Sequence, residues 1–117
     1  MLIGQLAERT GTSERLLRYY ERVGLLASGR RANGYRDYDP AAERTVRQIR
    51  ALLAAGLSTS LIRQVLPCGL ADGSLRPCPG VLDKLRAQLG RLDRRAEELD
   101  EARQTLRRAI ATTEQVE

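Results

Sequence analysis

The side chains with the most distinctive chemistry lie in two short stretches of the chain. The first holds arginines and every tyrosine, namely Tyr19, Tyr20, Tyr35 and Tyr38, in a sequence that has no Trp, Phe or His. Guanidinium groups and phenol hydroxyls both donate hydrogen bonds to phosphate oxygens. The second stretch holds the two cysteines, Cys68 and Cys78. We therefore expect anion binding in the first stretch and ask whether the second carries thiol chemistry.

The positive charge is concentrated in the N-terminal half of the chain. The sequence has 20 basic and 15 acidic residues and a pI near 9.9. Residues 1–59 contain ten arginines against six acidic residues, whereas residues 60–117 contain ten basic residues against nine acidic ones. Codon bias accounts for a preference for Arg over Lys, but not for this clustering. An anionic partner is therefore expected to bind the N-terminal half.

The chain has no feature that directs it to a membrane or out of the cell. No apolar run approaches the ~20 residues that a membrane helix needs. The N-terminal sequence MLIGQLAERTG lacks the apolar core and cleavage site of a signal peptide. We expect a cytoplasmic protein without a membrane partner, in which cysteines are more often reduced, catalytic or metal-linked than structural.

Two short helices with a tight connection are expected at the N-terminus. An amphipathic segment runs from Ile3 to Gly11, and Ser13 is a suitable N-cap for a second helix that closes at Gly24. This pattern predicts a helix-turn-helix. One face of the second helix would carry Arg15, Arg18, Tyr19 and Arg22, and the other Leu16, Leu17, Tyr20 and Val23. The basic face suits contact with phosphates and base edges, although a solvated charged face would have the same composition.

A basic β-hairpin is expected directly after the helix-turn-helix. Asn33-Gly34 is a strong signal for a type I′ turn, with arms at about residues 29–32 and 35–38. The arms carry Arg30, Arg31 and Arg36. The alternative is a small β-unit whose tyrosines only pack on the helices. A helix-turn-helix followed by a basic hairpin forms a winged arrangement.

Two further helices and a loop complete the first domain. Asp39 and Pro40 suit the start of a helix that stops at Gly56, and Ser58 caps another helix that ends at Pro67. The N-terminus of this last helix could hold a phosphate, or Ser58 could be an ordinary cap. Glycine and proline dominate residues 68–80, where periodicity disappears.

A heptad stripe follows the loop and predicts a long helix with a partner. Steps of three and four separate the apolar positions Leu82, Leu85, Leu89, Leu92, Ala96, Leu99, Leu106 and Ile110, with Arg103 as the one break. The simplest partner for such a stripe is a second copy of the chain, so we expect a homodimer.

These motifs together resemble the MerR family of bacterial transcription regulators. The resemblance runs through IGQLAERTGTSERLLRYYERVGLL, RRANGYRDYD, the next two helices and the long C-terminal helix. It implies a mostly α fold with three parts: a winged helix-turn-helix DNA-binding domain at 1–67, a Cys-containing loop at 68–80, and an antiparallel coiled-coil dimerisation helix at 81–117. No enzymatic activity is implied.

The resemblance also implies roles for individual residues. The recognition-helix face would be Arg15, Arg18 and Tyr19, and the wing contacts to the DNA backbone would involve Arg31, Arg36 and Tyr38 around Asn33 and Gly34. Tyr20 would combine packing with a phosphate contact, so that tyrosine rings pack while their hydroxyls reach DNA. Leu16 stands where the family often has Thr, and Ser28 stands where Pro is common, so base preference and wing angle are expected to differ.

The mechanism that the resemblance implies is a change in DNA shape. The homodimer would bind a pseudo-palindromic, double-stranded promoter whose −35 and −10 elements are too widely spaced. It would bend and underwind the spacer so that RNA polymerase can engage both elements. The alternative is an architectural DNA-binding protein that needs no inducer.

Three interpretations of Cys68 and Cys78 stay open. They could form a disulfide, structural or redox-switching; they could bind a soft metal with nearby acidic groups in a metal-responsive regulator; or they could be inert thiols. Cys78 would lie near the start of the long helix, whose dipole favours thiolate. A thiol oxidoreductase is not favoured, because the spacing is not C-x-x-C and no base is evident. No cofactor is otherwise expected.

Overall fold

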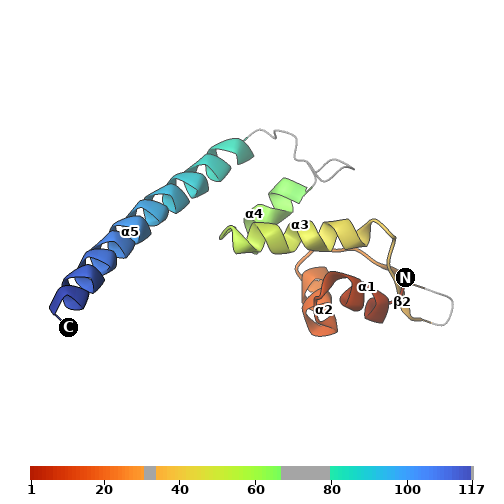
Figure 1. The fold of residues 1–117 in the computed structure, drawn as a ribbon. Helices are drawn as coiled ribbons and strands as arrows, with labels where there is room; N and C mark the ends of the chain where they lie inside the picture. The colour runs from red at the N-terminus through yellow and green to blue at the C-terminus, as the bar shows by residue number, and fades with distance from the viewer. Residues whose placement is uncertain (31–33, 67–79, 117) are drawn as a thin grey trace. The chain divides into compact units, whose positions relative to one another are not determined.

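The computed structural model describes residues 1–30, 34–66 and 80–116. It divides the chain into two compact units, Met1–Val81 and Leu82–Glu117, which are considered separately below. Both units are built mainly of helices, with one small two-stranded sheet in the first, and the second is a single long helix (Figure 1). The mostly helical fold class predicted from the sequence is therefore confirmed.

The first two helices form the predicted helix-turn-helix. Helix α1 (Ile3–Thr10) ends where Gly11 adopts a left-handed conformation, with φ of 62°. Helix α2 (Glu14–Arg22) begins after Ser13, whose hydroxyl accepts a hydrogen bond from the Leu16 amide at 3.1 Å. The expected stop and cap are thus both present.

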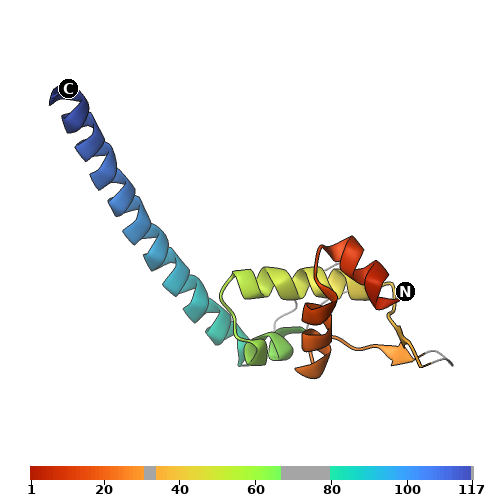
Figure 2. The same ribbon diagram turned by 90° about the horizontal axis from the view of Figure 1, so that it is seen from below.

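An arginine from the next helix clamps the turn between α1 and α2. Arg50 lies on α3 (Ala42–Ala54), and its Nη1 donates to the carbonyl oxygens of Thr10 and Gly11, both at 3.0 Å, and to Thr12 Oγ1 at 3.1 Å. A cation at the C-terminus of α1 also complements the helix dipole. Figures 1 and 2 both show α1 lying against α3, and α1 also contacts α2.

The wing is an antiparallel pair of short strands, β1 (Gly29–Arg30) and β2 (Arg36–Asp37), which pair Gly29 with Asp37 and Arg30 with Arg36. Gly34 has a φ of 86°, as the predicted tight turn requires, but Asn33 lies outside the described residues. After β2 the chain pairs with the N-terminus instead: the Tyr38 amide donates to the Met1 carbonyl at 2.7 Å. The Met1 ammonium donates to Asp37 Oδ1 at 3.0 Å.

Helix α3 starts two residues later than the sequence predicts. Asp39 and Pro40 lie in a turn, in which the Asp39 carboxylate accepts from the Ala41 amide at 2.8 Å and its carbonyl accepts from the Ala42 amide at 2.8 Å. Asp39 therefore stabilises the turn that leads into the helix and not the helix end itself. Helix α4 (Thr59–Val65) begins after Ser58, which caps it by accepting from the Leu61 amide at 3.1 Å.

The core of the first unit joins every helix of that unit to the end of the wing. Its most deeply buried side chains are Leu6, Leu17, Tyr20, Tyr38, Val46, Ile49, Ile62 and Val65. Burying such side chains provides about 1.5–3 kcal/mol each relative to exposure. This packing fixes α2 so that its opposite face points to solvent.

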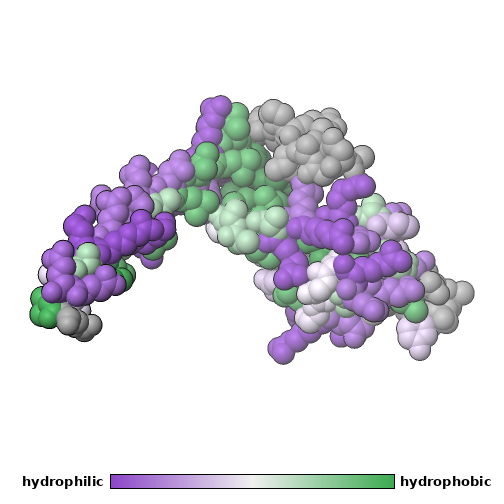
Figure 3. Space-filling view, in the orientation of Figure 1, coloured by the Kyte–Doolittle hydropathy of each residue, from purple (hydrophilic) through white to green (hydrophobic). Residues whose placement is uncertain are grey.

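The second unit is helix α5 (Val81–Val116), which has 36 residues. At 1.5 Å per residue it is about 54 Å long. Hydrophilic side chains cover much of its visible face in Figure 3, with hydrophobic ones among them. Its heptad positions other than the half-buried Leu85 are exposed, including Leu89 at 57%, Leu92 at 42%, Leu99 at 50%, Leu106 at 63% and Ile110 at 56%.

Candidate nucleic-acid interface

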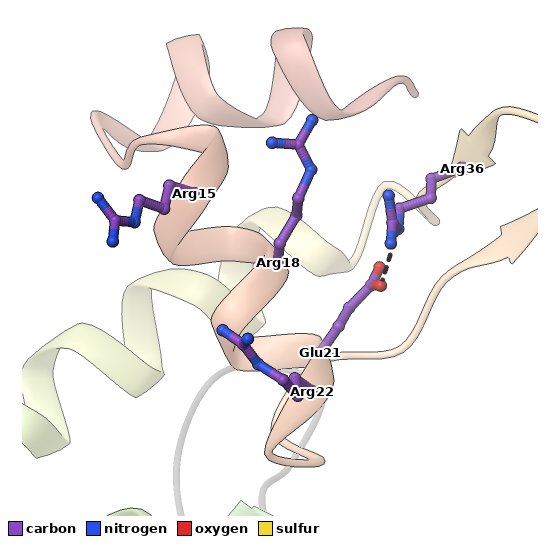
Figure 4. A pocket seen from close by; sticks show the side chains of 5 residues that line it. All are labelled: Arg15, Arg18, Glu21, Arg22 and Arg36. Atoms are coloured by element: carbon purple, nitrogen blue, oxygen red, sulfur yellow. Dashed lines mark hydrogen bonds and ion pairs between the residues drawn. The ribbon is translucent and has the colours of Figure 1, made fainter.

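Four guanidinium groups gather on one exposed surface of the first unit. Arg15, Arg18 and Arg22 come from successive turns of α2, and Arg36 comes from β2 (Figure 4). Together with Glu21 they line an open depression of about 630 Å³. Its lining is polar and mostly positive, which suits an extended polyanion better than an apolar ligand. We name this surface the basic depression.

An ion pair joins α2 to the wing inside the basic depression. Arg36 Nε donates to Glu21 Oε2 at 3.0 Å, with side-chain exposures of 31% and 17% (Figure 4). Burial by itself would raise the pKa of Glu21, but the hydroxyls of Ser28 and Tyr38 and the guanidinium of Arg36 outweigh it, and the pKa is lowered. Glu21 is therefore ionised at neutral pH.

Tyr38 is a buried neighbour of this ion pair. Its side chain is 1% exposed, and burial followed by the nearby Glu21 carboxylate raises the pKa of its hydroxyl. The hydroxyl and Glu21 Oε1 are both buried, and neither makes a well-aligned hydrogen bond within the described part of the chain. The two groups are nevertheless close enough for each to shift the pKa of the other.

The exposed tyrosine of α2 supports one of the arginines. Tyr19 is 37% exposed, and the guanidinium carbon of Arg22 lies 5.6 Å from the centre of its ring. This cation–π contact orients the Arg22 guanidinium beside the basic depression. Tyr19 also lies next to the buried Tyr20, with ring centres 6.3 Å apart.

The structure corrects the idea that tyrosine rings pack while their hydroxyls reach DNA. Tyr20 and Tyr38 are each 1% exposed and belong to the core, whereas Tyr19 and Tyr35 are 37% and 65% exposed. The roles are divided between the residues, because a ring that is buried to this depth carries its hydroxyl away from the surface. The Tyr38 hydroxyl therefore does not reach the surface in this structure, and the same burial disfavours a direct DNA contact by Tyr20.

Leu16 also departs from its expected place. It was assigned to the apolar face of α2, but it is 38% exposed, whereas Leu17 is fully buried. Leu16 lies at the border of the two faces, one position after Arg15, and an apolar side chain there can contact a thymine methyl group. The position at which Leu16 replaces the Thr that is common in the MerR family is thus exposed.

A second depression, of about 710 Å³, lies beside the first and shares Arg18 and Arg36 with it. Its other lining residues come from α1, the start of α2 and the wing: Leu2, Ile3, Gly4, Gln5, Glu8, Glu14, Gly34 and Tyr35. Gly34 and Tyr35 thus line the same depression as Glu14 and Arg18 of α2.

The remaining predicted residues are placed as follows. The Ser58 hydroxyl caps α4, which is the second of the two alternatives considered for this residue. Arg31, Asn33, Cys68 and Cys78 lie outside the described residues. Sequence reasoning missed Glu21 and Arg50 altogether. The one sequence signal for Glu21 is that it is an acidic residue within a basic stretch. No local signal identifies Arg50, because its hydrogen-bond partners are about 40 residues away in the sequence.

No group of three or more potential metal ligands occurs within residues 1–30, 34–66 and 80–116. Over the same residues, no helix combines the length and the apolar character needed to cross a bilayer.

Comparison with known proteins links both units to one family. The model of the MerR HTH family regulatory protein matches residues 1–67, and the MerR DNA-binding model matches residues 43–109. The HTH-type transcriptional regulator HmrR of Rhizobium leguminosarum bv. viciae is 34% identical over 110 residues, which cover 94% of this chain and 84% of that protein.

Solved structures show the same fold. A MerR family transcriptional regulator from Listeria monocytogenes has a TM-score of 0.72 and 26% identity, covering 94% of this chain and 83% of its own. HiNmlR, a MerR family regulator lacking the sensor domain and bound to promoter DNA, has a TM-score of 0.69 and 23% identity, with coverage of 94% and 86%.

Proposed function

The chain belongs to the MerR family of DNA-binding transcriptional regulators, which are not enzymes, and we propose that it binds promoter DNA as a homodimer through the basic depression. The observation that carries this proposal is that four arginines from α2 and β2 line one exposed depression. Phosphate contacts by such groups set the position of a protein on the duplex and supply most of its non-specific affinity.

The dimensions of α2 suit the major groove. A helix with its side chains is about 10–12 Å wide, and the major groove is about 12 Å wide. Arg15 and Arg22 are seven residues apart on α2, which corresponds to about 10 Å along the helix axis. That distance matches about three base pairs. The helix can thus read a short half-site with Leu16 and Tyr19, while the four arginines of the basic depression contact the phosphates beside it.

The homodimer is proposed from the exposed apolar stripe of α5. An isolated helix of this length, with leucines exposed at heptad positions, gains stability by burying them against a partner helix. A two-fold dimer would present two copies of α2, so the operator should be a pseudo-palindrome with half-sites related by the same symmetry.

Promoter activation would follow from deformation of the DNA. We propose that the dimer bends and underwinds the spacer between the −35 and −10 elements, so that RNA polymerase engages both. A smooth bend costs about 1–6 kcal/mol, which the wing and backbone contacts would offset. HiNmlR, which has the same fold, was solved on promoter DNA. An architectural DNA-binding protein is the alternative.

The test is selection of bound duplexes from a random library by the intact protein, followed by titration of the selected duplex. A pseudo-palindromic consensus and a complex of two chains per duplex would support the proposal. Footprinting on genomic DNA then separates the two functions: protection centred between promoter elements fits a regulator, and many scattered sites fit an architectural protein. Failure to bind any duplex at low salt would refute DNA binding through this surface.

A thiol switch at Cys68 and Cys78 is a further part of the proposal and rests on the sequence alone. The unreduced protein would be alkylated under denaturing conditions with a chelator present, and then weighed intact. Two unlabelled cysteines in a chain of monomeric mass fit an internal disulfide, whereas two labelled cysteines refute it. Metal analysis of the untreated protein tests the metal-responsive alternative.

A further inference from the structure

A single carboxylate lies among the arginines of the basic depression. Glu21 is on α2 between Arg18 and Arg22, and its side chain is 17% exposed. Negative charge at this position opposes the attraction between the depression and DNA phosphates. If the depression served only to attract DNA, a neutral side chain would serve better. The position of Glu21 therefore needs another explanation.

We propose that Glu21 is a positioning residue that holds the wing at a fixed angle to the recognition helix, so that sequence-selective DNA binding depends on it although it does not contact DNA. This inference rests on the proposed DNA-binding function of the basic depression.

The first argument is the set of groups that surround the carboxylate. Its Oε2 accepts from Arg36 of β2 at 3.0 Å. Ser28 lies directly before β1, Tyr38 directly follows β2, and the hydroxyls of both are close enough to act on the carboxylate. One side chain of α2 thus engages residues at the base of both strands. Such a group restrains the strand pair as a whole and not one strand alone.

The second argument is how Arg36 is held. Its bond to Glu21 uses Nε, so the four N–H donors on its two Nη atoms are not consumed by that bond. A guanidinium fixed in this way loses less conformational freedom when it binds a phosphate. Arg15, Arg18 and Arg22 are exposed, whereas Arg36 is half-buried. Glu21 therefore orients the wing arginine of the basic depression before DNA arrives.

The third argument is that Ser28 supplies a hydroxyl at the junction between α2 and the wing. A proline at that position would offer no side-chain donor. In this chain the Ser28 hydroxyl instead acts on the Glu21 carboxylate. Under the proposal, polar contacts to Glu21, with the Arg36 bond at 3.0 Å as the main one, set the approach of the wing in place of a rigid ring.

The proposal and simple electrostatics predict opposite results for Glu21→Gln. Removing a negative charge should tighten binding to every duplex if Glu21 acts only through its charge. If Glu21 is a positioning residue, binding to the selected duplex should weaken by about tenfold, the effect of losing one charge-assisted hydrogen bond. Binding to a scrambled duplex should stay equal or become tighter. The ratio of the two affinities is therefore the quantity to measure.

The experiment uses the full chain and fluorescence anisotropy at one fixed salt concentration. The probes are the duplex selected by the wild-type protein and a scrambled duplex of the same composition. The matched control is Glu8→Gln, which removes an exposed carboxylate from α1 at the edge of the second depression. Thermal unfolding of each variant shows that it is folded at the temperature of the titration.

A double-mutant cycle with Arg36→Gln shows whether Glu21 acts through the wing arginine. We expect Glu21→Gln to reduce the affinity ratio in the wild-type background and to have less than half of that effect when Arg36 is already replaced. Conversely, Glu21→Asp, which keeps the charge, should restore part of the ratio. The control Glu8→Gln should leave the ratio unchanged within about twofold.

Three outcomes would overturn the inference. Tighter binding of Glu21→Gln to both duplexes would show that Glu21 acts by charge alone. An unchanged ratio would show that it does not position the wing, and an equal effect of Glu21→Gln with or without Arg36 would exclude action through that arginine. The proposed DNA-binding function is tested separately: it is refuted if the wild-type chain shows no salt-dependent binding to either duplex.

Discussion

The number of arginines in the basic depression predicts how steeply DNA binding depends on salt. Four arginines line the depression in each chain, so the proposed dimer would make about eight phosphate contacts. Each contact contributes about −0.9 to the slope of log K against log salt, which gives a slope of about −7. Between 50 and 200 mM salt the affinity should therefore fall about 10⁴-fold.

The informative perturbation is the pair Arg15→Ala and Arg18→Ala. Both residues are exposed on α2, and their removal halves the number of phosphate contacts. Arg36 is kept, because removing it would leave Glu21 half-buried without its cation. The slope should become about −3.6, and the affinity should fall only about 10²-fold over the same range of salt.

Fluorescence anisotropy with the selected duplex at four or more salt concentrations measures both slopes. The control replaces Arg94 and Arg108 of α5, which are exposed and lie outside the basic depression, so it makes the same change in net charge. Its slope should stay at the wild-type value. A wild-type slope in the Arg15→Ala and Arg18→Ala variant would place the DNA on another surface.

The remaining predictions concern the Arg50 hydrogen bonds, the apolar stripe of α5 and the Tyr38 hydroxyl. Arg50→Ala should lower the free energy of unfolding, measured by urea denaturation, by about 1–2 kcal/mol, because three hydrogen bonds to the α1–α2 turn are lost. The control Arg44→Ala, at an exposed position of the same helix, should change it by less than about 0.5 kcal/mol. Equal effects of the two substitutions would refute the role of Arg50 in holding the turn. Leu99→Lys should weaken dimerisation by about 100-fold or more, measured by analytical ultracentrifugation. Glu101→Lys, on the other face of α5, should leave dimerisation unchanged. A stable Leu99→Lys dimer would contradict dimerisation through the apolar stripe of α5. The pKa of Tyr38 is raised in the folded state, so its contribution to the free energy of unfolding is present below the unfolded pKa of about 10 and is lost as pH rises further. Tyr38→Phe should therefore flatten the fall in the free energy of unfolding between about pH 9.5 and 11. An unchanged pH profile would show that the hydroxyl ionises freely.

Helix boundaries were predictable where a single residue type has a local structural role. Gly11 can take a positive φ at the end of α1, and Ser13 and Ser58 have hydroxyls that cap the helices after them. The start of α3 was misplaced, because Asp39 can stabilise a turn as readily as a helix end. Both outcomes use the same hydrogen-bonding capacity, and the sequence does not distinguish them.

The basic face of α2 was also predictable, because helical spacing alone places Arg15, Arg18 and Arg22 together. The division of the tyrosines was not. Tyr19 and Tyr20 are adjacent and chemically identical, yet one is 37% exposed and the other 1%. Which of them is buried depends on where α1 and the rest of the core pack against α2.

The sequence by itself determined the helical periodicities, the caps, the charge asymmetry and the apolar stripe of α5, since each depends on neighbours within a few residues. Only the tertiary structure decided that Arg36 meets Glu21 and that Arg50 reaches back to the α1–α2 turn. These contacts join residues 15 and about 40 positions apart. Their formation depends on how the elements pack, because a charged side chain can pair with any opposite charge or carbonyl that the fold brings within its reach.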